Sequence, residues 1–181
     1  TMTAGTLDGE IMGAAYVRGD GAAVQDGDSF VAVTGGTQAA ATDKGQYIIG
    51  GGKAMAYNGD SATSTVTGTS QVLISGESTE INGGAVVGGS VAKATGTGTA
   101  SATVVDSIVD VQGGTLAGVI GGSMAESYSV SEGGSATASV DNTSKVTVRG
   151  GEVGNIKFGA VADNDGELAA AVVGGSFANG E

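Results

Sequence analysis

The sequence predicts an all-β protein, a right-handed parallel β-helix (solenoid) of about five coils with three strands in each coil. Three observations predict this fold. Short phrases recur with a period near 37 residues, apolar residues alternate with polar ones inside each phrase, and 36 of the 181 residues are glycine while none is proline. Strands that repeat in this way stack in parallel at about 4.8 Å, and right-handed crossovers are the usual connection between parallel strands.

The first predicted strand of each coil carries the pattern Val-x-Val-x-Gly-Gly. Its second apolar position recurs after 41, 37 and 37 residues, at Val33, Ile74, Val111 and Val148, two residues after Val31, Val72, Val109 and Val146. An alternation of period two places these side chains on one face of a strand, so we expect them to form two columns in the core. The glycines that follow supply the positive φ that a sharp corner needs.

The second and third predicted strands come later in each repeat. The second continues from an aliphatic residue into glycine and alanine, and its aliphatic column is Ile11, Ile48, Val86, Val119 and Ile156. The third is the phrase Ser-Ala-Thr, which starts at Ser61, Ser101 and Ser135. We expect the second strand to line a narrow part of the core, because small residues such as Ala54, Ala92 and Ala125 replace valine there.

We expect residues 1–181 to form a single β-helix segment of a longer array. The second-strand pattern begins near Glu10, and no amphipathic stretch that would cap the first coil precedes it. Towards the other end, Val172 follows Ile156 by only 16 residues, which predicts that a further coil begins there out of step with the others.

Two stretches carry a resemblance to a known family. VDVQGGTLAGVIGGSMA at 109–125 and VTVRGGEVGNIKFGAVA at 146–162 resemble the Gly-Gly-Thr and Val-x-Gly-Gly-Ser repeats of bacterial autotransporter passenger domains, the surface adhesins of the AIDA and pertactin type. The resemblance implies export to the outer surface of a bacterial cell and a role as a stalk or adhesin. Its implied partner is a receptor on a host or bacterial cell, or the same protein on a neighbouring cell.

Charge and composition exclude several partners and several kinds of chemistry. The chain has 19 acidic residues against 7 basic ones, a net charge of −12, whereas nucleic acids and anionic membranes attract basic patches. No apolar run reaches about 18 residues, so we expect no membrane insertion by this segment. Histidine and cysteine are absent, which removes the most common general base and the thiol nucleophile. We therefore expect no enzyme activity and no cofactor.

Two pairs of acidic residues nevertheless have the spacing of catalysts or ligands. Asp26 and Asp28 form one pair, and Asp163 and Asp165 form the other, both in predicted turns. Two carboxylates about 5 to 9 Å apart serve glycosidases, and clustered carboxylates bind calcium. Neither pair lies in an EF-hand loop or a calcium-binding nonapeptide, so we expect solvated turn acids, with a calcium site as the alternative.

The triplet Arg18, Gly19 and Asp20 follows the second strand of the first repeat. A loop of this kind presents a cation and a carboxylate, which integrins recognise, and pertactin-like adhesins carry the same triplet. The alternative is an ordinary turn rich in glycine and aspartate. Elsewhere, the four tyrosines are dispersed and indicate no aromatic face for carbohydrate, whereas Ser135, Thr137 and Ser139 present hydroxyls to a like surface or to glycan attachment.

The function inferred from the sequence is a non-catalytic structural and adhesive β-helix, secreted or displayed on the cell surface, that acts in cell adhesion or self-association. The rival hypothesis is a polysaccharide-degrading or polysaccharide-binding β-helix of the lyase or tailspike type, since fold alone does not separate the two. A groove lined by acids and an aromatic residue would favour the rival. A plain face of serine and threonine would favour the adhesin.

Overall fold

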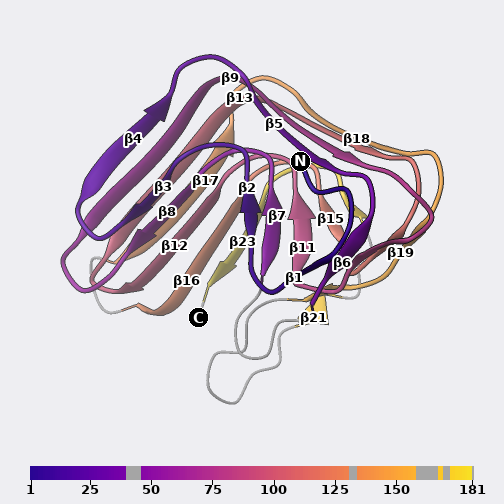
Figure 1. Ribbon diagram of the computed structural model, residues 1–181. Coiled ribbons are helices and arrows are strands. Elements are labelled where there is room, and N and C mark those ends of the chain that lie inside the picture. Colours follow the sequence, from indigo (N-terminus) through magenta and orange to yellow (C-terminus); the bar gives the residue numbers. More distant parts are fainter. Residues whose placement is uncertain (40–45, 131–133, 158–166, 169–171, 181) are drawn as a thin grey trace.

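The computed structural model describes residues 1–39, 46–130, 134–157, 167–168 and 172–180, and these form an all-β solenoid (Figure 1). Strands from successive turns of the chain lie side by side and build four parallel sheets along the stack. The prediction of a parallel β-solenoid with a repeat near 37 residues is therefore confirmed. Among the described residues, no helix is long and apolar enough to cross a lipid bilayer.

Each turn of the solenoid passes through the four sheets in order. The first sheet contains β1 (Thr6–Leu7), β6 (Gly36–Gln38), β10 (Thr79–Ile81), β14 (Thr115–Leu116) and β19 (Glu152–Val153). The second contains β2 (Ile11–Met12), β7 (Tyr47–Ile49), β11 (Ala85–Val87), β15 (Val119–Ile120) and β22 (Val172–Val173). The third contains β3 (Tyr16–Arg18), β8 (Lys53–Ala56), β12 (Val91–Gly96), β16 (Met124–Val130) and β23 (Phe177–Gly180).

The fourth sheet is the widest. It contains β4 (Gly21–Gln25), β9 (Ser61–Ile74), β13 (Thr99–Val111) and β17 (Ser135–Val140), while β5 (Ser29–Val33) pairs with β9 and β18 (Ser144–Val148) pairs with β13. In β9 and β13 the predicted third strand of one repeat runs without a break into the predicted first strand of the next. The phrases Ser-Ala-Thr and Val-x-Val therefore belong to one sheet.

The prediction of three strands per coil is wrong, because one turn crosses four sheets. The predicted second strand is in fact two strands, since a corner such as residues 50–52 bends the chain from the second sheet into the third. The first sheet has no counterpart among the predicted strands. Its strands are only two or three residues long, which is too short for an alternation to show.

The stack has about four turns rather than about five, and β19, β22 and β23 begin the next one. The prediction that Ile156 continues the aliphatic column is wrong. Ile156 lies in β20 (Ile156–Lys157), which pairs antiparallel with β21 (Glu167–Leu168). Val172 takes the place beside Val119, so the tail is in step with the other turns and the longer spacing contains an insertion. The sequence that starts at Ile156 has the aliphatic and glycine pattern of the repeat although it belongs to this insertion.

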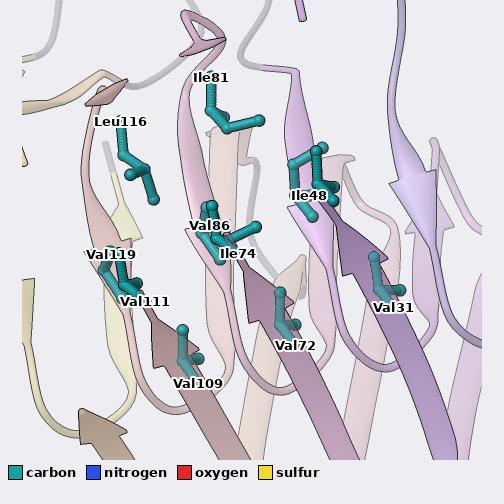
Figure 2. Packing of buried hydrophobic residues seen from close by; sticks show 11 residues of the cluster. Val31, Ile48, Val72, Ile74, Ile81, Val86, Val109, Val111, Leu116 and Val119 are labelled. Atoms are coloured by element: carbon teal, nitrogen blue, oxygen red, sulfur yellow. The ribbon is translucent and has the colours of Figure 1, made fainter. Parts of the chain in front are cut away.

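The predicted valine columns form the main core up to Val109 and Val111 (Figure 2), whereas Val148, predicted to continue the second column, is 45% exposed. Val31, Val72 and Val109 lie on adjacent strands of the fourth sheet and belong to one apolar cluster with Ile48 and Val86 of the second sheet. Burial of one such side chain contributes about 1.5–3 kcal/mol. The columns therefore supply a large share of the apolar stabilisation in a chain with few aromatic residues.

Alanine forms the narrow part of the core, as predicted. Ala54 and Ala92 of the third sheet pack against Ala62, Ala100 and Ala102 of the fourth. The second sheet is also buried on its other face, where Tyr47, Ile49, Ala85, Val87 and Ile120 pack with Val91 and Met124 of the third sheet. A strand that is buried on both faces shows no alternation of polar and apolar residues.

Glycine corners between the second and third sheets are held by serines of the fourth sheet, of which Ser29, Ser70 and Ser107 are buried. The hydroxyls of Ser29, Ser70 and Ser144 donate to the carbonyl oxygens of Gly50, Gly88 and Gly174 at 2.8, 2.5 and 2.7 Å, and Ser107 donates to Gly121 in the same way. The next turn packs directly on the corners at Gly50, Gly88 and Gly121. A methyl group on Gly88 would lie 2.5 Å from the carbonyl oxygen of Gly121, so the corner has no room for a side chain.

Candidate functional site

The triplet Arg18, Gly19 and Asp20 forms the corner between the third and fourth sheets in the first turn. Gly19 has a φ of 82° and donates its N–H to the carbonyl oxygen of Met55 at 2.9 Å. Asp20 Oδ1 accepts a hydrogen bond from the N–H of Ser61 at 2.7 Å. The backbone of the triplet therefore follows the next turn closely, while the side chains of Arg18 and Asp20 are exposed. Integrin binding by this loop stays a prediction.

Two tyrosines, Tyr16 and Tyr57, lie near this corner. The guanidinium carbon of Arg18 lies 5.2 Å from the centroid of the Tyr57 ring, and the N–H of Tyr57 donates to Asp60 Oδ2 at 3.2 Å. Tyr16 is two residues before Arg18 on β3, so both side chains lie on the same face of the strand. We call the five residues Tyr16, Arg18, Asp20, Tyr57 and Asp60 the Tyr16 patch.

The ring of Tyr16 is fixed although it is 46% exposed. Its hydroxyl donates to Met55 Sδ at 3.0 Å, and Lys53 Nζ lies 6.0 Å from the ring centroid. Burial of the hydroxyl and the nearby Tyr57 raise the pKa of Tyr16, while Arg18 lowers it. The phenol therefore stays protonated at neutral pH, and part of its ring surface faces solvent.

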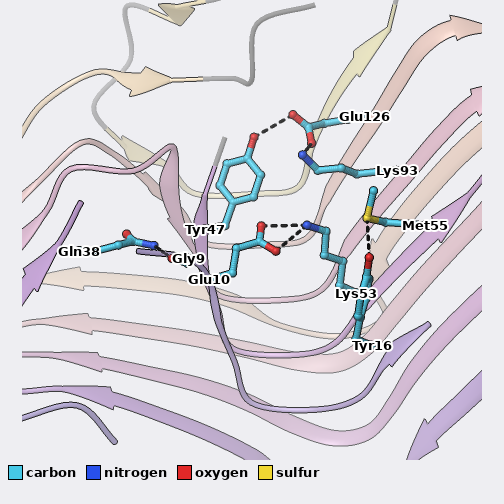
Figure 3. A network of polar contacts seen from close by, with 9 residues as sticks. All are labelled: Gly9, Glu10, Tyr16, Gln38, Tyr47, Lys53, Met55, Lys93 and Glu126. Carbon is cyan, nitrogen blue, oxygen red and sulfur yellow. Dashed lines mark hydrogen bonds and ion pairs between the residues drawn. The ribbon is translucent and has the colours of Figure 1, made fainter. Parts of the chain in front are cut away.

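A second cluster of charged side chains lies inside the molecule, between the second and third sheets (Figure 3). Lys53 Nζ donates to both carboxylate oxygens of Glu10, at 2.8 and 2.6 Å. Lys93 forms an ion pair with Glu126, and its ammonium group lies 4.7 Å from the centroid of the Tyr47 ring. The Tyr47 hydroxyl donates to Glu126 Oε1 at 2.8 Å. Burial and the neighbouring Lys93 lower the pKa of Lys53, while Glu10 and Glu126 raise it.

This interior cluster holds successive turns together. Each ion pair joins different turns, because Glu10 precedes β2 while Lys53 is on β8, and Lys93 is on β12 while Glu126 is on β16. Glu126 and Tyr47 are both 0% exposed, so a polymer chain has no access to them in this arrangement. Buried charges are tolerated only where they are paired, and the pairing here also selects the register of the stack.

Sequence reasoning missed the interior cluster, although the signal was present. The alternation that places Ala54 and Ala92 in the core places Lys53 and Lys93 on the opposite face of the same strands. Strand register then sets Lys93 beside Glu126. An outward face is ordinarily solvent-exposed, and here it is covered because the second sheet folds back over the third.

The acidic pair Asp26 and Asp28 is engaged by the neighbouring turn. Asp26 Oδ1 accepts a hydrogen bond from Thr67 Oγ1 at 2.9 Å, and Asp28 Oδ1 accepts one from the N–H of Thr69 at 2.7 Å. Asp163 and Asp165 lie outside the residues that the structure describes. Within the described ranges, no three acidic side chains converge in a way that would hold a metal ion. Calcium binding therefore stays untested, and Asp26 and Asp28 have a structural role.

The outer face of the fourth sheet carries nine serines and threonines in register. The register forms three columns, which are Ser61, Thr99 and Ser135, then Thr63, Ser101 and Thr137, then Thr65, Thr103 and Ser139. Within the last column the Ser139 hydroxyl donates to Thr103 Oγ1 at 3.2 Å. The expected outward position of Ser135 and Thr137 is confirmed by their exposure. We call these nine residues the hydroxyl face.

Comparison of the chain with protein-family models, with curated proteins and with solved structures finds no match. Function is therefore inferred from the two exposed surfaces, the Tyr16 patch and the hydroxyl face. The two meet at one corner, where Asp20 of the patch accepts the N–H of Ser61 at the start of the face.

Proposed function

We propose that this chain is a non-catalytic structural and adhesive β-helix that is displayed on, or secreted from, a bacterial cell. It presents its hydroxyl face to a receptor on a host or bacterial cell, or to a second copy on a neighbouring cell. The observation that supports this proposal is the hydroxyl face, in which three successive turns place serine or threonine at each of three strand positions.

The chemistry of the hydroxyl face suits adhesion for two reasons. A hydroxyl both donates and accepts hydrogen bonds, so an array of hydroxyls pairs with many polar surfaces, including an identical one. The nine residues carry no charge although the chain has a net charge of −12, so two copies that approach through these faces avoid the closest like-charge contacts. The solenoid behind the array fixes the spacing of the hydroxyls at about 4.8 Å between turns.

Surface display tests this proposal. Bacteria of a non-adherent strain that carry the chain on their surface are expected to clump or to attach to epithelial cells, compared with the same strain without it. Ser101→Asp and Thr137→Asp together put two charges into the hydroxyl face and should reduce the attachment severalfold. Thr34→Asp is the matched control, because Thr34 is exposed and lies outside the nine residues. Equal attachment with and without the displayed chain would refute the adhesive role.

The rival function, polysaccharide degradation, has a separate readout. The purified chain is incubated with neutral and acidic polysaccharides, and new reducing ends and unsaturated products are measured. We expect no product above background. Product formation that Glu126→Gln leaves unchanged would place the active groups outside the interior cluster, and any product formation would overturn the non-catalytic proposal.

A further inference from the structure

The exposed ring of Tyr16 is presented in a way that suits a ligand. Its hydroxyl is bonded to Met55, and the ammonium group of Lys53 lies over the ring. Lys53 is only 6% exposed, so the side of the ring towards Lys53 is covered and the solvent-exposed area lies elsewhere on the ring. A ring that is already immobilised loses little conformational entropy when a ligand stacks on it.

The neighbouring turn adds a second ring and a cation. Tyr16 pairs in register with Lys53 and Arg18 with Met55, and Tyr57 follows the end of β8 two residues after Met55. The guanidinium carbon of Arg18 lies 5.2 Å from the centroid of the Tyr57 ring. The patch therefore combines two aromatic rings and a cation from two adjacent turns.

Polar groups beside the two rings supply both hydrogen-bond donors and hydrogen-bond acceptors. Asp20 Oδ1 accepts the N–H of Ser61 in the next turn, and Asp60 Oδ2 accepts the N–H of Tyr57 in its own turn. A carboxylate accepts hydrogen bonds through both of its oxygens. Arg18 supplies several N–H donors from an exposed side chain. The exposed amide of Asn58 lies next to Tyr57 and both donates and accepts.

We propose that the Tyr16 patch binds a neutral oligosaccharide, a proposal that rests on the adhesive function above and names its ligand. The apolar face of a sugar ring stacks on Tyr16, and the hydroxyls of the sugar chain donate to Asp20 and Asp60 and accept from Arg18. Ligand sites of this kind combine an apolar platform with a few polar groups that fix orientation. Arg18 and Asp20 belong to the corner formed by residues 18–20, so that corner contributes to a larger glycan-binding surface.

The charges of the patch select a neutral ligand. Lys53 and Glu10 neutralise each other as an ion pair, which leaves one guanidinium, Arg18, against the two carboxylates of Asp20 and Asp60. The carboxylates of an acidic saccharide would be repelled by those of Asp20 and Asp60. The net charge of −12 on the whole chain adds to that repulsion.

Calorimetric titration with defined sugars tests the assignment. The probes are hexasaccharides of glucose, mannose, galactose and N-acetylglucosamine, with hexagalacturonate as the acidic counterpart. We expect the wild-type chain to bind at least one neutral hexasaccharide and not hexagalacturonate. Tyr16→Ala should weaken that binding at least about tenfold, whereas Tyr16→Phe, which keeps the ring, should bind within about threefold of the wild type.

Phe30→Ala is the matched control, because Phe30 is an exposed aromatic residue, 53% accessible, on the separate strand β5. It should leave sugar binding unchanged. Far-UV circular dichroism and melting of each variant establish that the solenoid is intact, and Arg18→Gln provides a second test of the patch that leaves both rings in place. Arg18→Gln should weaken binding severalfold.

Three results would overturn the inference: no binding of any neutral hexasaccharide, preferential binding of hexagalacturonate, or binding that Tyr16→Ala leaves unchanged. Failure of the inference is distinguishable from failure of the adhesive function. If displayed cells still attach while no sugar binds, the ligand assignment alone is wrong. Attachment that is lost with Asp20→Glu but kept with Tyr16→Ala would indicate a protein receptor of the integrin type that reads Arg18 and Asp20.

Discussion

A methyl group added to a glycine corner should separate two turns of the solenoid. Gly88 is the most informative site, because the third and fourth turns close on it from several sides. The added methyl of Gly88→Ala would lie 2.5 Å from the carbonyl oxygen of Gly121 and 2.6 Å from Val109 Cγ2, and it would also overlap the hydroxyl oxygen of Ser107. Gly174 is the equivalent corner position one turn beyond Gly121, and it has nothing within 4 Å of the added carbon.

The expected loss follows from which atoms would have to move. Overpacking in a core costs about 1–3 kcal/mol where side chains can adjust. At Gly88 one of the overlapping atoms is backbone, and the others belong to Val109 in the valine column and to the corner serine Ser107, so we expect a loss of about 3 kcal/mol or more. Gly174→Ala meets no neighbour, and a lower entropy of its unfolded chain should stabilise it by about 0.4–1 kcal/mol.

Thermal unfolding followed by circular dichroism separates the two variants. In a chain of this size, each kcal/mol of lost stability lowers the melting temperature by about 2–4 °C. Gly88→Ala should therefore melt about 6–12 °C below the wild type. Gly174→Ala should melt at or slightly above the wild-type temperature. Equal melting temperatures for the two variants would show that the turns do not pack on the glycine corners, and the stacking derived from them would be wrong.

Three further predictions concern the core and the interior cluster. Val109→Asp with Val111→Asp should prevent folding, because two charges would enter an apolar column; an unchanged circular dichroism spectrum and melting curve would refute the register. Glu126→Gln should lower the free energy of unfolding by about 3 kcal/mol by removing the carboxylate charge beside Lys93, whereas Lys93→Met with Glu126→Met should recover most of that loss; denaturant unfolding measures both, and equal losses would contradict the ion-pair argument. The pKa of Lys53 should lie below the ordinary value, since burial and Lys93 disfavour its charge, and NMR titration of the side chain measures it. The unfolded chain then binds more protons between the lowered pKa and about 10.4, so the contribution of Lys53 to stability should increase as the pH rises through that window.

The sequence was sufficient for the parts of the fold that repeat and alternate. Val31, Val72 and Val109 form a column as expected, because a strand with one buried face must place apolar residues at every second position. The alanine part of the core follows from the same rule, since Ala54 and Ala92 occupy the inward positions of the third sheet. Both predictions depend on local geometry alone, which a sequence contains.

The parts that were missed depend on contacts between sheets. A strand such as β14, with two residues, leaves no periodic trace, and its position is set by its pairing with β10 and β19. Ile156 fits the local aliphatic pattern as well as Val119 does, and only the pairing of β15 with β22 shows which segment continues the stack. Short phrases specify a strand, whereas the partner of that strand is decided by the whole turn.

The surfaces were missed for a related reason. The tyrosines are dispersed in sequence, and Tyr57 follows Tyr16 by 41 positions, which is close to the length of one turn. Stacking of turns brings residues one period apart onto adjacent strands, so dispersion along the chain becomes proximity on the surface. The register pairs Tyr16 with Lys53, and Tyr57 lies four residues further along the same turn, so a search at the repeat period alone does not find this pair.

The same period explains the position of Asp28, one of the acidic residues that first suggested catalysis or calcium. Asp20, Asp28 and Asp106 each accept the N–H of a residue that lies 41, 41 and 37 positions further along, which is one turn ahead. A carboxylate of this kind satisfies a backbone N–H that the strand ladder leaves unpaired. These acids therefore hold successive turns in register, whether they lie at a corner, as Asp20 does, or within the fourth sheet, as Asp106 does in β13. The nine residues of the hydroxyl face are uncharged, and such a face lets a strongly acidic chain approach a partner without the closest like-charge contacts.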